Sequence, residues 1–221
     1  MNNRIAFFDF DGTITTKDTL LEFIKFSKGP LLFGLGFLLT SPWVVAYKLK
    51  LISNQRAKEK VLQFFFRKTS LSRFQEVCDR FGATAIPGLL RPKALREIEN
   101  LQAAGFAVVI VSASPENWIR AWANQVQAHL IATRLEVVGG PPDIQSKSLE
   151  IQPNDAEMVK ARGPRLTGKI LGANCYGQEK VRRIQAEYNL ADYTDIYTYG
   201  DTGGDKPMLK LGTASFYKPF R

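Results

Sequence analysis

Cysteine and histidine are scarce in this chain of 221 residues, which contains two cysteines and one histidine. Cys78 and Cys175 are too few for a disulfide scaffold, so a reducing cytoplasmic compartment is the simplest setting. The single histidine, His129, excludes a metal site built from several histidines and disfavours a Ser-His catalytic pair. No internal repeat, low-complexity tract or N-terminal signal segment is visible, because an apolar strand is expected almost at Met1.

Acidic residues are also in deficit, with 21 Asp and Glu against 30 Lys and Arg, which gives a net charge of +9. A basic protein attracts phosphorylated substrates, nucleic acid or anionic membranes, although a generally basic surface has the same composition. The sequence has no aromatic and basic pattern typical of nucleic-acid readers. We therefore do not expect a nucleic acid to be the partner.

The most informative stretch is an apolar run that ends in two aspartates. Ile5 to Phe8 is predicted to be a buried parallel strand, and Asp9 and Asp11 follow it, with a turn at Asp11-Gly12. Ligands bind at the carboxyl ends of such strands. Since neighbouring carboxylates repel, the pair indicates a metal ion or a shared proton. The alternative is an Asp-Gly turn with a spare acid.

Two carboxylates in this position suit phosphoryl transfer. One can attack phosphorus to form an aspartyl-phosphate, while the other donates a proton to the leaving oxygen and later activates water. Mg²⁺ would hold the nucleophile and the phosphate. A second predicted strand, 107–111, ends in Ser112. Its neutral hydroxyl and the N–H groups of the next turn, such as that of Ala113, can hold phosphate oxygens.

Two further segments place polar residues at element ends. The first is Gly-Gln-Glu-Lys at 177–180, which opens a predicted helix through Glu187. The second is Gly-Asp-Thr-Gly-Gly-Asp at 200–205, which follows a predicted strand over 195–199. Together with the first two motifs, these segments resemble the haloacid dehalogenase (HAD) superfamily of phosphohydrolases, in its phosphoserine-phosphatase-like branch, subfamily IB. An acid at position 11 is not typical of the dehalogenases themselves.

This resemblance implies an α/β fold with a Rossmann-like three-layer α/β/α core, an inserted α-helical cap of the C1 type and a small β-hairpin. The core would comprise residues 1–16 and 86–221, and the cap residues 17–85. It also implies roles: Asp9 as nucleophile, Asp11 as general acid/base, and Ser112, Lys180 and the N–H groups of Gly12 and Ala113 as phosphate ligands. Mg²⁺ would be bound by Asp9, Asp201 and the backbone carbonyl of Asp11, with Asp205 binding or orienting a water on the metal.

The expected cap contains an unusual uncharged run, Leu31 to Tyr47, flanked by Lys25, Lys28, Lys48 and Lys50. It is short for a transmembrane helix and Pro42 interrupts it. Three interpretations remain open: the core of the cap, a homodimer interface, or contact with a membrane surface. After it, 54–67 is predicted to be a basic amphipathic helix, and 71–81 another helix that Gly82 ends. The polar stretch 143–165 is not assigned.

The substrate is also left open. The expected activity is that of a Mg²⁺-dependent phosphomonoesterase for a small metabolite such as phosphoserine, with Glu22 and Arg56 holding the amino acid. An alternative is a lipid-phosphate phosphatase of the phosphatidylglycerophosphate type, docked at the inner membrane surface through Leu31–Tyr47. A second alternative is a phosphate-binding protein without catalysis.

Overall fold

The computed structural model describes residues 3–139 and 163–221. Contacts divide the chain into two compact units. The first contains residues 1–23, 79–133 and 173–221, and the second contains residues 24–78 and 134–172. We call them the core unit and the helical unit. Most of the unassigned stretch 143–165 lies outside the described residues.

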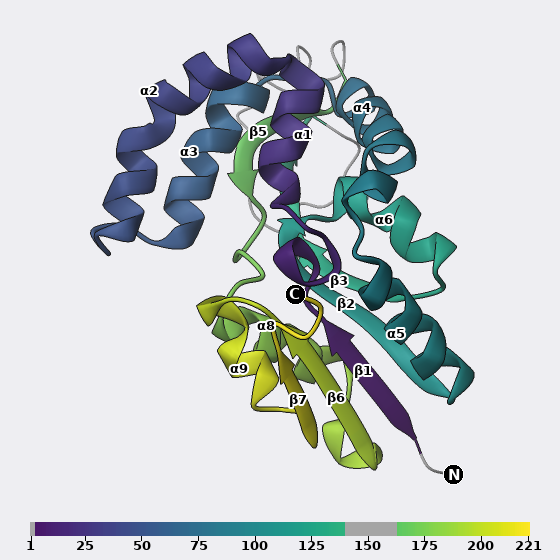
Figure 1. Ribbon diagram of the computed structural model, residues 1–221. Helices are drawn as coiled ribbons and strands as arrows, with labels where there is room; N and C mark the ends of the chain where they lie inside the picture. Colours follow the sequence, from purple (N-terminus) through teal and green to yellow (C-terminus); the bar gives the residue numbers. More distant parts are fainter. Residues whose placement is uncertain (1–2, 140–162) are drawn as a thin grey trace. The chain divides into compact units, whose positions relative to one another are not determined.

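A five-stranded parallel sheet forms the centre of the core unit (Figure 1). The strand order is β3-β2-β1-β6-β7. The strands are β1 (Arg4–Phe8), β2 (Phe106–Pro115), β3 (His129–Thr133), β6 (Asp195–Gly200) and β7 (Ala214–Tyr217). The apolar run that precedes Asp9 therefore forms the central strand, hydrogen-bonded on both sides.

Both faces of this sheet are covered, as the near-continuous apolar strands require. Ile5 and Phe7 point to one face, where they pack with Ile184 of α8 (Gln178–Glu187) and Met208 of α9 (Lys206–Leu209). On the opposite face Phe8 stacks on Tyr199. The Tyr199 hydroxyl donates to Glu97 of α5 (Pro92–Ala103) at 2.7 Å. The predicted three-layer α/β/α core is confirmed.

The remaining elements of the core unit are shorter or peripheral. Helix α5 (Pro92–Ala103) precedes β2 in the chain, and helix α6 (Glu116–Gln125) follows it. Four short helical turns are η1 (Phe10–Ile14), η2 (Ile86–Leu89), η3 (Leu190–Asp192) and η4 (Gly203–Asp205). Turns η1 and η4 follow β1 and β6 directly, so both lie at the carboxyl ends of neighbouring strands.

The helical unit combines helices with a β-hairpin. Its elements are α2 (Pro30–Lys48), α3 (Asn54–Phe66), β4 (Leu135–Val138) and β5 (Arg165–Ile170), while α1 (Thr19–Lys28) and α4 (Leu71–Thr84) cross the boundary between the units. Asp18 caps α1, because its carboxylate accepts from the N–H groups of Leu20 and Leu21.

The hairpin groups with the helices of the second unit, whereas the sequence predicts it within the core range 86–221. Lys68 N donates to Leu166 O at 2.8 Å, and Leu166 N donates to Thr69 O at 2.9 Å. A Cβ at Gly168 would lie 2.5 Å from Gln63 Cα, so β5 and α3 are in close backbone contact. The sequence gives no local signal for this backbone pairing, because the paired residues are 97 and 98 positions apart.

Helix α2 continues through Pro42, so the predicted interruption is wrong. Proline cannot bond the carbonyl four residues before it, here that of Leu38. The Ser41 hydroxyl donates to this carbonyl at 2.7 Å and thereby satisfies it. By length and composition, α2 is the one helix among the described residues able to cross a membrane.

Helix α4 likewise continues past Gly82, which was predicted to end it. A Cβ at Gly82 would lie 3.3 Å from the backbone oxygen of Trp118, at α6. The glycine is therefore explained by the close approach of α4 and α6 rather than by a helix end.

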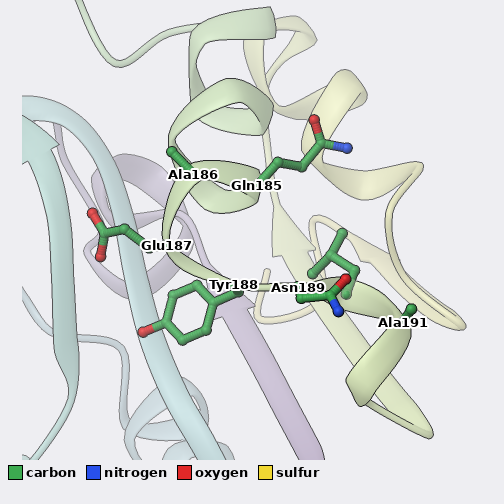
Figure 2. A pocket seen from close by; sticks show the side chains of 7 residues that line it. Gln185, Ala186, Glu187, Tyr188, Asn189 and Ala191 are labelled. Carbon is green, nitrogen blue, oxygen red and sulfur yellow. The ribbon is translucent and has the colours of Figure 1, made fainter.

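A cavity of about 520 Å³ lies at the C-terminal end of α8, lined by residues 185–191 (Figure 2). It contains none of the predicted site residues, and the carboxylate of Glu187 is bonded to His129. Lys180, one of the predicted site residues, lies at the opposite, N-terminal end of α8.

Candidate active site

The turn after β1 brings its backbone against the loop after β6. Asp9 continues the sheet pairing, because its N–H donates to Tyr199 O at 2.9 Å. In η1, Gly12 has φ +82°, and a Cβ there would lie 2.5 Å from Asp201 Oδ2. Only glycine permits this conformation and this approach, which explains the Asp-Gly pair in the motif.

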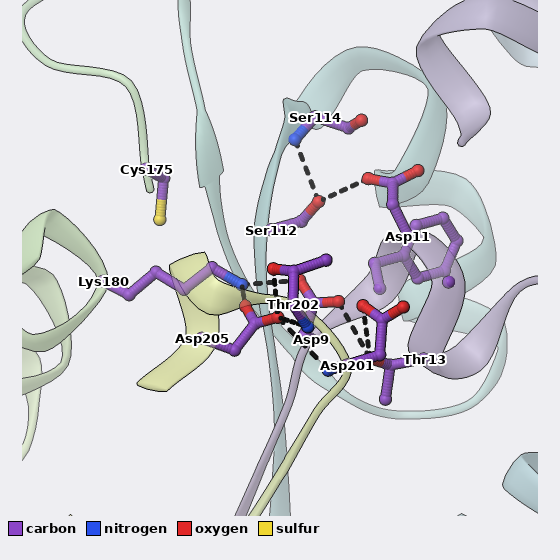
Figure 3. A network of polar contacts seen from close by, with 12 residues as sticks. Asp9, Asp11, Thr13, Ser112, Ser114, Cys175, Lys180, Asp201, Thr202 and Asp205 are labelled. Carbon is purple, nitrogen blue, oxygen red and sulfur yellow. Dashed lines mark hydrogen bonds and ion pairs between the residues drawn. The ribbon is translucent and has the colours of Figure 1, made fainter. Parts of the chain in front are cut away.

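Three aspartates from the carboxyl ends of β1 and β6 meet in the core unit (Figure 3). Asp9, Asp201 and Asp205 are all buried, and each offers a carboxylate oxygen within 4.8 Å of the others. Carboxylate oxygens are the ligands that a hard divalent cation such as Mg²⁺ prefers. The donor chemistry of this aspartate cluster therefore fits the metal that the sequence predicts.

Lys180, at the start of α8, inserts its side chain into the aspartate cluster. Its ammonium group lies 2.5 Å from Asp9 Oδ1 and 2.7 Å from Asp205 Oδ1, and the side chain is 1% exposed. Burial alone would lower the pKa of Lys180, but the charges of Asp9 and Asp205 outweigh it and raise this pKa above its usual value. Lys180 is therefore a buried, charged group.

One buried lysine does not balance three buried carboxylates. Burial raises the pKa of Asp9 to about 7, even though Lys180 acts in the opposite direction. Burial, with the nearby charge of Asp205, also raises the pKa of Asp201. A divalent cation among these oxygens would relieve the excess negative charge, so electrostatics and donor chemistry agree.

Asp205 is fixed by the loop that carries it. Its Oδ2 accepts from Asp201 N at 3.2 Å, Thr202 N at 2.9 Å and Thr202 Oγ1 at 2.7 Å. Burial would raise the pKa of Asp205, but Lys180 and the Thr202 hydrogen bonds outweigh it and lower this pKa. With Oδ1 on Lys180, both oxygens are engaged, so this carboxylate holds the loop and the lysine in position.

Asp11 has a different environment and is not a member of the aspartate cluster. Its Oδ1 accepts from the N–H and hydroxyl of Thr19, at 2.7 and 2.5 Å. Its Oδ2 accepts from the Ser112 hydroxyl at 3.3 Å. Ser112 is buried and in turn accepts from Ser114 N at 3.0 Å. The structure thus places Asp11 and Ser112, which were predicted from separate strands, side by side.

Three residues of the site were not predicted. Thr13 donates to Asp9 Oδ2 at 2.9 Å and lies 3.5 Å from Asp201 Oδ1. Its place directly after the Asp11-Gly12 turn was a usable signal. Thr19 anchors Asp11, and Arg221 donates to Asp201 Oδ2. Nothing in the local sequence marks these last two contacts, because each joins separate segments of the chain.

Several predicted residues have other surroundings. The Gly12 N–H donates to Thr15 Oγ1 at 3.2 Å, and Ala113 is half-buried in β2. Glu22 lies on α1, with its carboxylate 3.7 Å from Lys17 Nζ. Arg56 is exposed on α3, in the helical unit. Their roles in binding phosphate or selecting the substrate stay predictions.

Comparison with known proteins agrees with this geometry. The family model of the haloacid dehalogenase-like hydrolases matches residues 6–156 and 153–210. The chain belongs to this family, and it is therefore an enzyme of the hydrolase class rather than a binding protein without catalysis. It is 30% identical over 217 residues to protein CicA from Caulobacter vibrioides, a match that covers 97% of this chain and 85% of the relative.

Solved structures show the same fold. A protein of unknown function from Bordetella pertussis Tohama I has a TM-score of 0.73 at 20% identity, over 97% of this chain and 89% of that one. A substrate-bound phosphoserine phosphatase has a TM-score of 0.60 at 15% identity, over 98% and 86% of the two chains. The fold is thus the one that the phosphoserine phosphatases of this family use.

Proposed function

We propose that the protein is a Mg²⁺-dependent phosphomonoesterase that acts through an aspartyl-phosphate on Asp9. The observation that carries this proposal is the convergence of Asp9, Asp201, Asp205 and Lys180 at one sheet edge, with Asp11 beside Ser112. This arrangement brings a carboxylate nucleophile (Asp9), a cation (Lys180) and a separate acid (Asp11) together in the core unit.

In the first step, an Asp9 carboxylate oxygen attacks the phosphorus atom of the ester. A bond forms between Asp9 and phosphorus as the bond from phosphorus to the ester oxygen breaks. Asp11 gives its proton to that departing oxygen, which leaves as an alcohol. Because Thr19 donates twice to Oδ1 of Asp11, we assign the transferred proton to Oδ2, on the side of Ser112.

In the second step, Asp11 takes a proton from a water molecule that attacks the phosphorus atom of the aspartyl-phosphate. The bond between Asp9 and phosphorus breaks, so inorganic phosphate and the free Asp9 carboxylate are restored. Lys180 and the Ser112 hydroxyl would hold phosphoryl oxygens during both steps. Thr13, which donates to Asp9, would keep the nucleophile in one orientation.

Mg²⁺ would be held by Asp9, Asp201 and the backbone carbonyl of Asp11, with Asp205 orienting a water on it. When bound, it supplies positive charge to the phosphoryl oxygens and neutralises the excess of buried carboxylates. Arg221 donates to Asp201 Oδ2, which leaves Oδ1 of the same carboxylate available as a ligand.

Two substrate classes follow from different observations. A small soluble ester such as phosphoserine is favoured by the fold shared with phosphoserine phosphatases. An amphiphilic ester of the phosphatidylglycerophosphate type is favoured by the exposed apolar surface of α2, where Leu31 is 90% and Leu38 is 69% exposed. Exposed apolar surface of this size marks a site of contact with a membrane or with another protein.

Phosphate release tests both parts of the proposal. The panel would contain p-nitrophenyl phosphate, phosphoserine and phosphatidylglycerophosphate in mixed micelles, each with Mg²⁺ and with excess chelator. We expect hydrolysis that requires Mg²⁺ and is abolished by Asp9→Asn. The control Asp192→Asn changes an exposed carboxylate outside the site and should leave the rate unchanged. Turnover by Asp9→Asn, or a rate indifferent to chelation, would refute the mechanism.

A further inference from the structure

Helix α2 has its large apolar side chains on the outside. The residues it buries are Gly36 and Thr40, a small residue and a polar one. The Thr40 hydroxyl is satisfied inside the helix by Gly36 O at 2.7 Å. Leu31, Leu35 and Leu38 are 90%, 55% and 69% exposed. This is the reverse of the pattern that a helix at the surface of a water-soluble protein shows.

The exposed side chains form a continuous strip. Their main spacings of three, four and seven residues place them along one side of the helix. We define the α2 strip as the exposed apolar residues on this side of α2 and directly after its end: Leu31, Leu35, Leu38, Leu39, Val45 and Leu49. Contiguous apolar surface of this kind on a folded protein marks a site of contact with another apolar phase or partner.

The partner helix explains why the α2 strip faces outward. α2 packs along α3, and a Cβ at Gly36 would lie 2.2 Å from Phe65 Cζ and 2.6 Å from Phe64 Cε1. The two helices are therefore in close contact at Gly36. The small residue is needed on the inner side, which leaves the leucines to the outer side.

The charge around the α2 strip is almost entirely positive. Residues 24–70 contain nine lysines and arginines and one acidic residue, Glu59. This segment therefore accounts for nearly all of the net charge of +9 that the whole chain carries. Glu59 offsets only one of the nine positive charges, and its carboxylate accepts from Gln55 Nε2 and from Ile170 N. The excess charge of the protein is thus concentrated in the segment that carries the apolar strip.

Several of these cations border the strip directly. Lys48 and Lys50 are exposed at the C-terminal end of α2, and the ammonium group of Lys60 lies 4.8 Å from the centroid of the Trp43 ring. Trp43 is 41% exposed. Leucine with lysine and tryptophan at its edges is the composition of helices that lie in the interface of a bilayer.

We propose that the α2 strip docks the protein on an anionic lipid bilayer, with α2 in the plane of the membrane. Crossing the bilayer is disfavoured, because α3 packs along α2 and carries Arg56, Lys58 and Lys60. A second copy of the chain is a poorer occupant, since a symmetric pair would bring the same lysines together. Anionic headgroups complement the lysines while the acyl region accepts the leucines.

Sedimentation with vesicles tests this proposal independently of catalysis. The probes are vesicles of phosphatidylglycerol mixed with phosphatidylcholine, and vesicles of phosphatidylcholine alone. We expect binding to the anionic vesicles that weakens at high salt. The triple variant Leu35→Gln, Leu38→Gln, Leu39→Gln should lower the affinity at least about a hundredfold. Lys48→Gln with Lys50→Gln should lower it about fivefold for each lysine removed.

The matched control removes two exposed charges from α5 in the core unit, Lys93→Gln with Arg96→Gln. It should bind vesicles like the unchanged protein. An equal loss in the control, full binding by the leucine variant, or no binding by the unchanged protein would each overturn the proposal. So would dimerisation that the leucine variant abolishes without any vesicle binding.

The hydrolysis of p-nitrophenyl phosphate separates this proposal from the proposed function. The leucine variant should retain this activity, which also shows that it folds, because the aspartate cluster lies in the core unit. Vesicle binding by a protein without phosphatase activity would support docking and refute the catalytic assignment. The converse result would refute docking alone.

Discussion

The ammonium group of Lys180 lies 2.5 Å from Oδ1 of Asp9, although 171 residues separate them in the chain. The two residues belong to different elements, the start of α8 and the end of β1. Their contact is the centre of the candidate site, because it sets a buried cation beside the proposed nucleophile.

Replacing Lys180 by methionine keeps the length of the side chain and removes its charge. We expect kcat to fall by about 10²- to 10³-fold, with a smaller change in KM, if the charge acts mainly on the transition state. Steady-state kinetics with p-nitrophenyl phosphate measures both. Circular dichroism must accompany them, because Asp9 and Asp205 lose their buried partner. The exposed Lys210→Met is the matched control, and equal kinetics for the two variants would exclude a catalytic role.

Asp11→Asn separates the two chemical steps. p-Nitrophenolate is a good leaving group and needs little help from an acid, so the first step should continue while hydrolysis of the aspartyl-phosphate slows by about 10²- to 10⁴-fold. We therefore expect a burst of p-nitrophenol equal to the enzyme concentration, followed by a slow steady rate. Asp9→Asn should give no burst. If Asp11→Asn turns over at the normal rate, the general acid/base lies elsewhere.

Gly34 and Gly36 form a matched pair on α2. Alanine at either position favours the helix by up to about 1 kcal/mol. At Gly34 nothing lies within 4 Å of the new Cβ, so Gly34→Ala should stabilise the protein. At Gly36 the Cβ would lie 2.2 Å from Phe65 Cζ, and we expect Gly36→Ala to destabilise by about 1–3 kcal/mol. Urea unfolding measures both, and stabilisation by Gly36→Ala would show that α2 and α3 are not in close contact.

Glu179 links stability to pH. Hydrogen bonds from Arg182, and then from Arg183, lower the pKa of Glu179 from 4.5 to about 2. A depressed pKa stabilises the fold above pH 4.5, and this contribution disappears as the pH falls from 4.5 towards 2. Because Arg182 is largely exposed, we expect Glu179→Gln to cost only about 1 kcal/mol at neutral pH.

The same variant should flatten the dependence of the unfolding free energy on pH in that acid range. Arg183 also donates to Ala132 O and Ala173 O, both at 2.6 Å. The ion pair of Glu179 and Arg183 therefore helps to hold α8, the helix that carries Lys180, in position. Urea unfolding at several pH values gives the measurement, and Glu99→Gln, at an exposed position of α5, is the control. An unchanged pH profile in Glu179→Gln would show that the carboxylate is not linked to folding.

From the amino-acid sequence alone, the parallel sheet and the main residues of the candidate site could be predicted. A buried apolar run that ends in Asp9, a second that ends in Ser112 and a third that precedes Asp201 predict parallel strands whose carboxyl ends share one edge. Parallel strands carry this information locally, since their continuous apolar character requires cover on both faces. Lys180 and Asp205 came from the order of the family's motifs.

The three-dimensional fold was needed to see how these groups are held and which side chains α2 exposes. The anchoring of Asp11 by Thr19, the contact of Arg221 with Asp201 and the attachment of β5 to α3 each join segments that no local pattern relates. For α2, composition shows that the run from Leu31 is apolar but cannot show which side is covered. The close approach of α3 at Gly36 decides this, because it occupies the side with the small residues and leaves the leucines to the surroundings.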